Sequence, residues 1–255
     1  MQVLIKRVED GKITFQQTSK IAIVTLNRSA SRNALKAGMW KELAEIGKQI
    51  SQSNKIKVVI LRGTAGQFTA GSDIKEFSAM SLGDADAAFQ MMEEAISAFE
   101  NLSIPVIGAI DGPAMGAGFV LSLACDLRIG TANTRMGIPV GRLGITLGPS
   151  FMRRIVREIG PSRAKELVYI GKIYHAEEAY QIGLLNQLVE NDHLDRTVLN
   201  LAHTIMRQST ASLKAAKKAV ELCEWRPEIP WSYVDPTDFP EGCLAFTEKR
   251  KPKFK

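Results

Sequence analysis

Two glycine-rich turns constrain the fold of this chain more than any other feature. FTAGSD occupies residues 68–73 and DGPAMGAGF occupies residues 111–119. Each turn follows an apolar run typical of a strand and leads into a segment with helical spacing. Small residues let a ligand approach the backbone, and the first turn of a helix has N–H groups without an internal partner. Two such turns that face each other can hold one oxygen between two backbone donors, as an oxyanion hole does. The sequence therefore indicates an enzyme that acts through an enolate or a similar oxyanion.

Strand-like and helix-like segments alternate over the first 150 residues or so. The runs KITFQ and IAIVTL predict two strands, and the long segment at residues 32–50 has helical spacing before the strand-like KVVILRG. This alternation favours an α/β fold with mostly parallel strands covered by helices. Later segments are almost entirely helical, and glycines end three predicted helices at positions 160, 171 and 183. The pattern changes from mixed strands and helices to helices alone near residue 195, with no linker between the two parts.

Composition narrows the class of protein. The chain has 255 residues, of which 45% are hydrophobic and 24% are charged, and this is ordinary for a globular protein. No uncharged apolar run approaches the length of a membrane span, and the first residues contain no apolar signal segment. We therefore expect a soluble, cytoplasmic protein. The three cysteines are widely separated and form no CxxC pair, so neither a disulfide framework nor a metal site is predicted.

The net charge of +6 is partly local to EKRKPKFK at residues 248–255. Such a run could meet phosphates on a ligand or on RNA, but a solvated terminus is the favoured interpretation. No RNA-recognition or helix-turn-helix signature is present, so a nucleic acid is not favoured as a partner.

Three segments together resemble the crotonase superfamily, the enoyl-CoA hydratases and isomerases. They are LNRSASRNAL at 26–35, FTAGSDIKEF at 68–77 and IPVIGAIDGPAMGAGFVLSLACDLRIGT at 104–131. The resemblance implies a crotonase-like spiral of β-β-α units over residues 1–195, with an acyl-CoA site. It implies that residues 196–255 form a helical trimerisation region, giving a homotrimer or a hexamer made of two trimers. It further implies a lyase or isomerase of fatty acid metabolism, with coenzyme A as part of the substrate and no other cofactor.

The same resemblance implies specific site residues. The backbone N–H groups of Ala70 and Ala117 would be the oxyanion donors, and Ala117 stands where a glycine is usual. The segment around the first turn would contact coenzyme A through Arg28, Ala34, Ala70, Gly71, Ser72, Asp73 and Ile74. For Arg28, a phosphate contact and a plain surface charge remain open alternatives.

The sequence departs from the family where hydratases carry two glutamates that act on water. Those positions are Val120 and Val140, and valine can neither hold a water nor move a proton. We therefore expect ordinary hydration to be lost or crippled. None of the other acids offers a clear replacement. Asp73, Asp111 and Asp126 are interpreted as structural, and the three histidines lie in the later helical region, at positions 175, 193 and 203.

Arg142 lies two residues beyond Val140, in a loop that borders the acyl pocket in relatives. Its planar fork could bind a substrate carboxylate, which would suit decarboxylation of a carboxyacyl-CoA because loss of CO2 itself generates the enolate. An ion pair between subunits or at a helix end is the alternative role. A third hypothesis is a catalytically silent binder of acyl-CoA, with Val120, Val140 and Arg142 lining the pocket.

Overall fold

The computed structural model describes residues 11–223, 237–250 and 252–254. Its main sheet has six strands in the order β1-β2-β3-β4-β6-β9, and only β1 is antiparallel to its neighbour. The strands are β1 (Lys12–Thr18), β2 (Ile21–Asn27), β3 (Val58–Gly63), β4 (Val106–Ile110), β6 (Leu127–Thr131) and β9 (Gln187–Val189). The predicted α/β class with mostly parallel strands is confirmed.

A second sheet of three short strands lies outside the main one. Its strands are β5 (Pro113–Met115), β7 (Arg135–Gly137) and β8 (Ile173–His175), in the order β5-β7-β8. Two isolated bridges extend it, one between Thr69 and Ala114 and one between Leu35 and Ser72. Through these bridges the segment before α1, the first glycine-rich turn and the strand of the second turn lie side by side.

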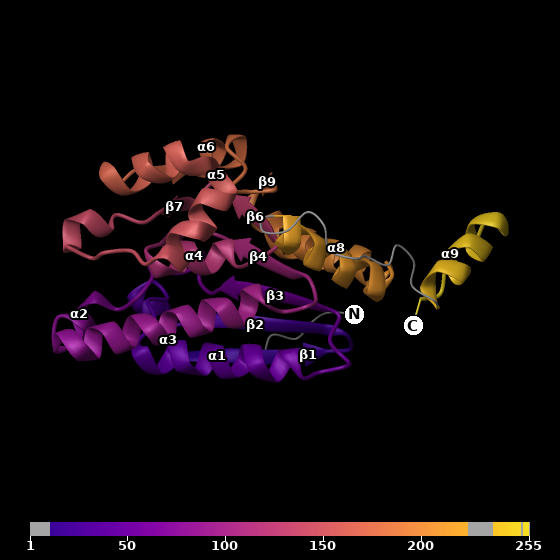
Figure 1. The fold of residues 1–255 in the computed structure, drawn as a ribbon, viewed down its shortest axis with the longest axis horizontal. Coiled ribbons are helices and arrows are strands. Elements are labelled where there is room, and N and C mark those ends of the chain that lie inside the picture. Colours follow the sequence, from indigo (N-terminus) through magenta and orange to yellow (C-terminus); the bar gives the residue numbers. More distant parts are fainter. Residues whose placement is uncertain (1–10, 224–236, 251, 255) are drawn as a thin grey trace.

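The helices cover both faces of the main sheet (Figure 1). In chain order they are α1 (Ala37–Ser51), α2 (Ile74–Phe77), α3 (Leu82–Glu100), α4 (Ala117–Leu123), α5 (Pro149–Tyr169), α6 (Ala176–Gln181), α7 (Leu194–Met206), α8 (Thr210–Cys223) and α9 (Asp238–Thr247). Short 3-10 turns occur at η1 (Ser29–Ser31), η2 (Val140–Leu143) and η3 (Asn191–His193).

Two hydrophobic clusters hold these layers together. The larger one joins the sheet to α1, α3, α4 and α5, and includes the fully buried Trp40, Phe99 and Phe119. The smaller one lies on the opposite face of the sheet, where Leu194, Val198 and Ala202 of α7 are buried against it. Helix α7 therefore crosses the predicted boundary near residue 195 and packs against the main sheet. The trimerisation role of residues 196–255 stays a prediction.

Glycines end helices where the sequence predicts. Gly160 has φ 74° and ψ 164°, which breaks α5 into two helical segments ahead of Pro161. Gly171 and Gly183 also have positive φ, a conformation that glycine adopts at little cost.

The structure differs from the sequence-based expectation in two places. The first long helix starts at Ala37 and not at residue 32, because residues 32–35 turn to meet the glycine-rich loop. The second sheet was not expected. Among the described helices, none is long and apolar enough to cross a bilayer.

Candidate active site

The first glycine-rich turn leads from β3 into α2, and most of its N–H groups already have partners. The Ala70 N–H donates to the Arg32 carbonyl at 2.9 Å. The Gly71 N–H donates to the Thr69 hydroxyl at 3.0 Å, and the Asp73 N–H donates to the Leu35 carbonyl at 2.9 Å. The backbone donor that this part of the structure leaves without a partner is Ser72 N–H. The prediction that Ala70 supplies an oxyanion donor is therefore corrected, because its N–H is taken by Arg32.

The second turn leads into α4 and leaves another donor unpaired. Gly116 has φ 57° and donates its own N–H to the Gly137 carbonyl at 2.9 Å. Ala117 is the first residue of α4, and within the described structure its N–H has no acceptor, as expected for a helix start. This N–H is unpaired, and its role as an oxyanion donor stays a prediction.

The two turns are in direct contact. Gly71 has φ +90°, and a Cβ placed on it would collide with the Met115 carbonyl oxygen and lie 3.4 Å from the Ala117 nitrogen. A Cβ on Gly118 would collide with the Thr69 side chain. The glycines at 71 and 118 thus allow the two backbones to meet, and this places Ser72, the residue after Gly71, close to the start of α4 at Ala117.

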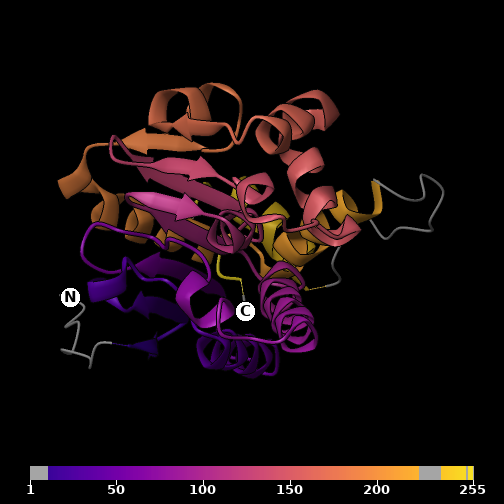
Figure 2. The ribbon, with the colours of Figure 1, turned by 90° about the vertical axis from the view of Figure 1, so that its left-hand side faces the viewer.

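Ser72 and Ala117 both line one apolar cavity of about 200 Å³. It lies at the α2 end of the molecule, the side that faces the viewer in Figure 2. Phe77 of α2 and Phe89 of α3 form an edge-to-face pair with ring centroids 5.4 Å apart, and Phe151 of α5 contributes a third ring to the wall. The remaining lining is Ala70, Ser72, Ile74, Met115, Gly116, Ala117, Ile138, Pro139, Val140, Leu143, Ile145 and Leu147. The cavity therefore suits an apolar group whose polar end meets two backbone donors.

None of the residues that line this cavity in the described structure has an ionisable side chain. Val140 lines it at the start of η2. Val120 is fully buried in the core and is not one of the residues that line the cavity, so the prediction that Val120 lines the pocket is corrected. The Ser72 hydroxyl accepts a hydrogen bond from Trp40 Nε1 at 3.2 Å and contacts Met92 Sδ at 3.0 Å. With both partners in the protein, this hydroxyl is not a candidate for proton transfer. Arg142 belongs to η2, but its side chain lies outside the description.

Arg28 and Asp73 bind each other. An Arg28 guanidinium nitrogen lies 2.8 Å from Asp73 Oδ2 and also donates to the Ala34 carbonyl at 2.9 Å. The hydrogen bond from Arg28 and its charge hold the pKa of Asp73 below its ordinary value, although burial opposes this. Asp73 also accepts from the Lys75 N–H at 3.1 Å and so caps α2, as predicted. Arg28 is thus not a plain surface charge, and a role for it in binding phosphate stays a prediction.

The other candidate acids lie away from the cavity. Asp111 accepts a hydrogen bond from the Thr131 hydroxyl at 2.7 Å, and Asp126 accepts one from the Val106 N–H at 2.7 Å. Both are structural, as predicted. The three histidines are exposed and do not line the cavity.

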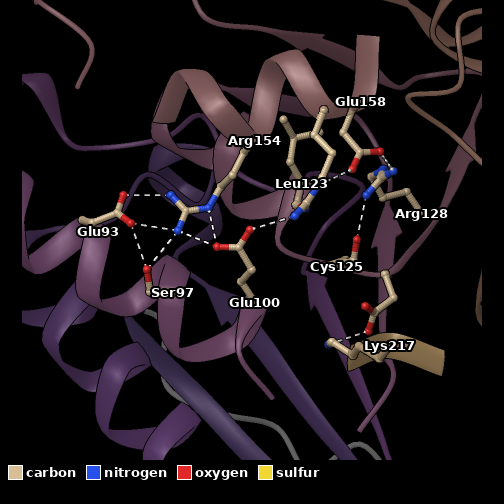
Figure 3. Close-up of polar contacts among 11 residues, drawn as sticks. Glu93, Ser97, Glu100, Leu123, Cys125, Arg128, Arg154, Glu158 and Lys217 are labelled. Carbon is tan, nitrogen blue, oxygen red and sulfur yellow. Dashed lines mark hydrogen bonds and ion pairs between the residues drawn. The ribbon is translucent and has the colours of Figure 1, made fainter. Parts of the chain in front are cut away.

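A polar cluster that sequence reasoning missed connects the helices behind the cavity (Figure 3). Arg154 of α5 is fully buried and binds Glu93 and Glu100 of α3 at 2.7 to 2.8 Å. Burial alone would raise the pKa of Glu93, but hydrogen bonds from Arg154 and Ser97 outweigh it and hold that pKa below its ordinary value. The cluster holds α3 against α5, the two helices to which Phe89 and Phe151 of the cavity wall belong. The spacing of the two glutamates on one helix face was the available signal.

The spiral of strands and helices, with two glycine-rich turns that meet beside an apolar cavity, defines a protein of the crotonase superfamily. The chain belongs to the enoyl-CoA hydratase/isomerase family, whose model matches residues 16–255. The resemblance stated from the sequence is confirmed.

Individual proteins similar to this chain are members of the same family. The human mitochondrial methylglutaconyl-CoA hydratase is 32% identical over 254 residues, covering 94% of this chain and 75% of that protein. The short-chain-enoyl-CoA hydratase of Clostridium acetobutylicum is 31% identical, covering 96% of this chain and 97% of that one. A crystal structure of an enoyl-CoA hydratase/carnithine racemase from Magnetospirillum magneticum superimposes with a TM-score of 0.90 at 32% identity, covering 97% and 96% of the two chains.

Proposed function

We propose that this protein binds an acyl-CoA thioester and stabilises its enolate with the N–H groups of Ser72 and Ala117. One observation carries the proposal: two unpaired backbone donors from adjacent turns meet at an apolar cavity. A thioester oxygen placed between them gains negative charge as the enolate forms. Fixed donors stabilise that charge more than they stabilise the neutral carbonyl, so they lower the barrier. Family membership supports a thioester as the ligand.

The cavity does not support hydration by paired carboxylates. Val140 replaces one of them in the lining, and Val120 is buried away from the cavity. A water molecule needs polar partners to be held and activated, and the described lining offers few. The relatives are named as hydratases; we infer that the reaction of this chain is a different or a much reduced one.

Decarboxylation of a carboxyacyl-CoA is the second candidate, and the apolar lining favours it. A carboxylate transferred from water into such a cavity loses solvation, which raises its free energy. When the bond between the α-carbon and the carboxylate breaks, its electron pair moves into the thioester to give the enolate, and CO2 leaves. The enolate then takes a proton from water. This reaction needs no general base, and Arg142 in η2 is the candidate to orient the carboxylate.

The test is mass spectrometry of a panel of thioesters incubated with the pure protein in D2O. The panel contains 2-enoyl-, 3-enoyl-, saturated and carboxyacyl-CoA. Deuterium uptake at the α-carbon, or loss of CO2 with uptake of one deuterium, is the expected result. Addition of water at an ordinary hydratase rate would contradict the account of the two valines. Binding without any mass change would instead identify a silent acyl-CoA binder.

A further inference from the structure

The apolar cavity that Ser72 and Ala117 line is called the acyl cavity below, after its proposed ligand. A second cavity, of about 510 Å³, lies at the opposite edge of the main sheet. Three separate segments form it: the turn between β1 and β2, the loop before β3, and the beginning of α8. Four lysines line it, Lys20, Lys55, Lys57 and Lys214, together with polar residues that include Ser19 and Asn54. Four lysines from three distant parts of the chain therefore line one concave surface.

In the part of the chain that the structure describes, few carboxylates are paired with these lysines. Within the described part of the chain, no ion pair joins Lys20, Lys55 or Lys214 to a carboxylate. Asp238, at the start of α9, is the carboxylate that acts on Lys57. Burial and the neighbouring charge of Lys20 nevertheless hold the pKa of Lys57 below its ordinary value. Like charges held this close repel one another, and a bound anion would relieve that repulsion.

Sheet register separates this cavity from the acyl cavity. Ile21, next to Lys20, pairs with Val58, next to Lys57, so both lysines lie where the parallel strands β2 and β3 begin. The two glycine-rich turns come after β3 and β4 end, at the opposite edge of the sheet. Figure 1 likewise shows α2 at the left of the sheet and α8 to the right of it. A ligand in the lysine cavity therefore does not occupy the acyl cavity.

We propose that the lysine cavity binds a small ligand that carries at least two phosphoryl groups. Lysine is a common phosphate ligand because its ammonium is a compact charge with three donors. Hydroxyl and amide groups such as those of Ser19 and Asn54 commonly complete phosphate sites. A single carboxylate would balance little of the charge of four lysines, whereas a diphosphate carries enough negative charge to balance most of it.

Isothermal titration of the full chain with inorganic pyrophosphate tests this, at low ionic strength and at about 0.15 M salt. We expect saturable binding of one pyrophosphate per chain. The double variant Lys55→Gln/Lys214→Gln removes two exposed lysines of the cavity, so it should fold normally and weaken binding by about tenfold or more.

The matched control is Lys41→Gln/Lys165→Gln. It removes the same charge from exposed positions on α1 and α5 that do not line the cavity, so affinity should stay within about twofold of wild type. Absence of saturable binding, or equal weakening in both double variants, would overturn the proposal. Binding of a single-stranded oligonucleotide would also overturn it, if that binding is lost in Lys55→Gln/Lys214→Gln and pyrophosphate does not compete with it. The surface would then be a nucleic-acid site.

Discussion

At the scale of single residues, the proposed chemistry depends on backbone groups and not on side chains. Ser72 and Ala117 contribute N–H groups that any residue except proline provides. What the sequence must supply is the close contact of the two turns, through glycine at 71 and 118. This explains why alanine is acceptable at 117, where a glycine is usual in the family.

Proline at position 117 should remove one donor without breaking a hydrogen bond. Ala117 is the first residue of α4, where proline is well tolerated. We expect Ala117→Pro to lower turnover of the reactive thioester by about 10²- to 10³-fold. Leu82→Pro, at the exposed first position of α3, is the matched control and should retain full activity. A folded Ala117→Pro protein with the wild-type rate would refute the assignment of this donor.

The two valine positions should respond differently to a carboxylate. Val140 is largely buried but lines the acyl cavity, so the carboxylate of Val140→Glu should lose less solvation than one at the enclosed position 120 and should cost less stability. Val120 is completely buried, and Val120→Glu should lower the free energy of unfolding by about 3 kcal/mol or more. Urea unfolding measures both. Equal stability of the two variants would show that Val120 also reaches the cavity.

At the scale of the elements, Arg154 links α5 to α3 through ion pairs with Glu93 and Glu100. Removing one partner of a buried ionic cluster leaves the others unpaired, which is more costly than losing the pair. We expect Arg154→Leu to lower the free energy of unfolding by about 3–5 kcal/mol. Arg153→Leu, at the exposed neighbouring position, should change it by no more than about 0.5 kcal/mol. Similar losses in both variants would argue against this role of the cluster.

The cluster also predicts a pH dependence. The pKa of Glu93 is lower in the folded protein than in the unfolded chain, so the folded state binds its proton less readily. This contribution to stability is present above the ordinary glutamate pKa and is lost as the pH falls through the lower, folded value. The difference in unfolding free energy between wild type and Glu93→Gln should therefore shrink below about pH 4. A difference that stays constant from pH 7 to that range would contradict this origin.

At the scale of the whole molecule, the long elements could be predicted from the sequence because each buries a regular apolar face. The second sheet could not, because β5, β7 and β8 are too short to show an alternating pattern. The sequence placed one donor at Ala70, whereas in the structure the unpaired N–H of that turn belongs to Ser72. Whether Ala70 or Ser72 has a free N–H depends on the Arg32 carbonyl, which only the fold brings to that turn. Arg154 was missed because an arginine in an amphipathic helix normally faces solvent.

The two proposed binding sites thus lie at opposite edges of one sheet. The turns that follow β3 and β4 form the acyl cavity, as ligands of parallel sheets commonly lie beyond the carboxyl ends of the strands. The lysine cavity lies beyond the opposite ends. Assembly into trimers or hexamers stays a prediction from the family, and sedimentation of the full chain would determine it.

The most direct test of the central claim is the infrared spectrum of a bound acyl-CoA labelled with ¹³C at its thioester carbonyl. Two donors on one oxygen weaken the C=O bond, so the account predicts a band at lower wavenumber on the wild-type protein than in water. The band should move back towards its position in water in Ala117→Pro and remain shifted in Ser72→Ala, which keeps its N–H. An unshifted band on the wild type, or an equal shift in Ala117→Pro, would contradict the claim that Ser72 and Ala117 hold the thioester oxygen.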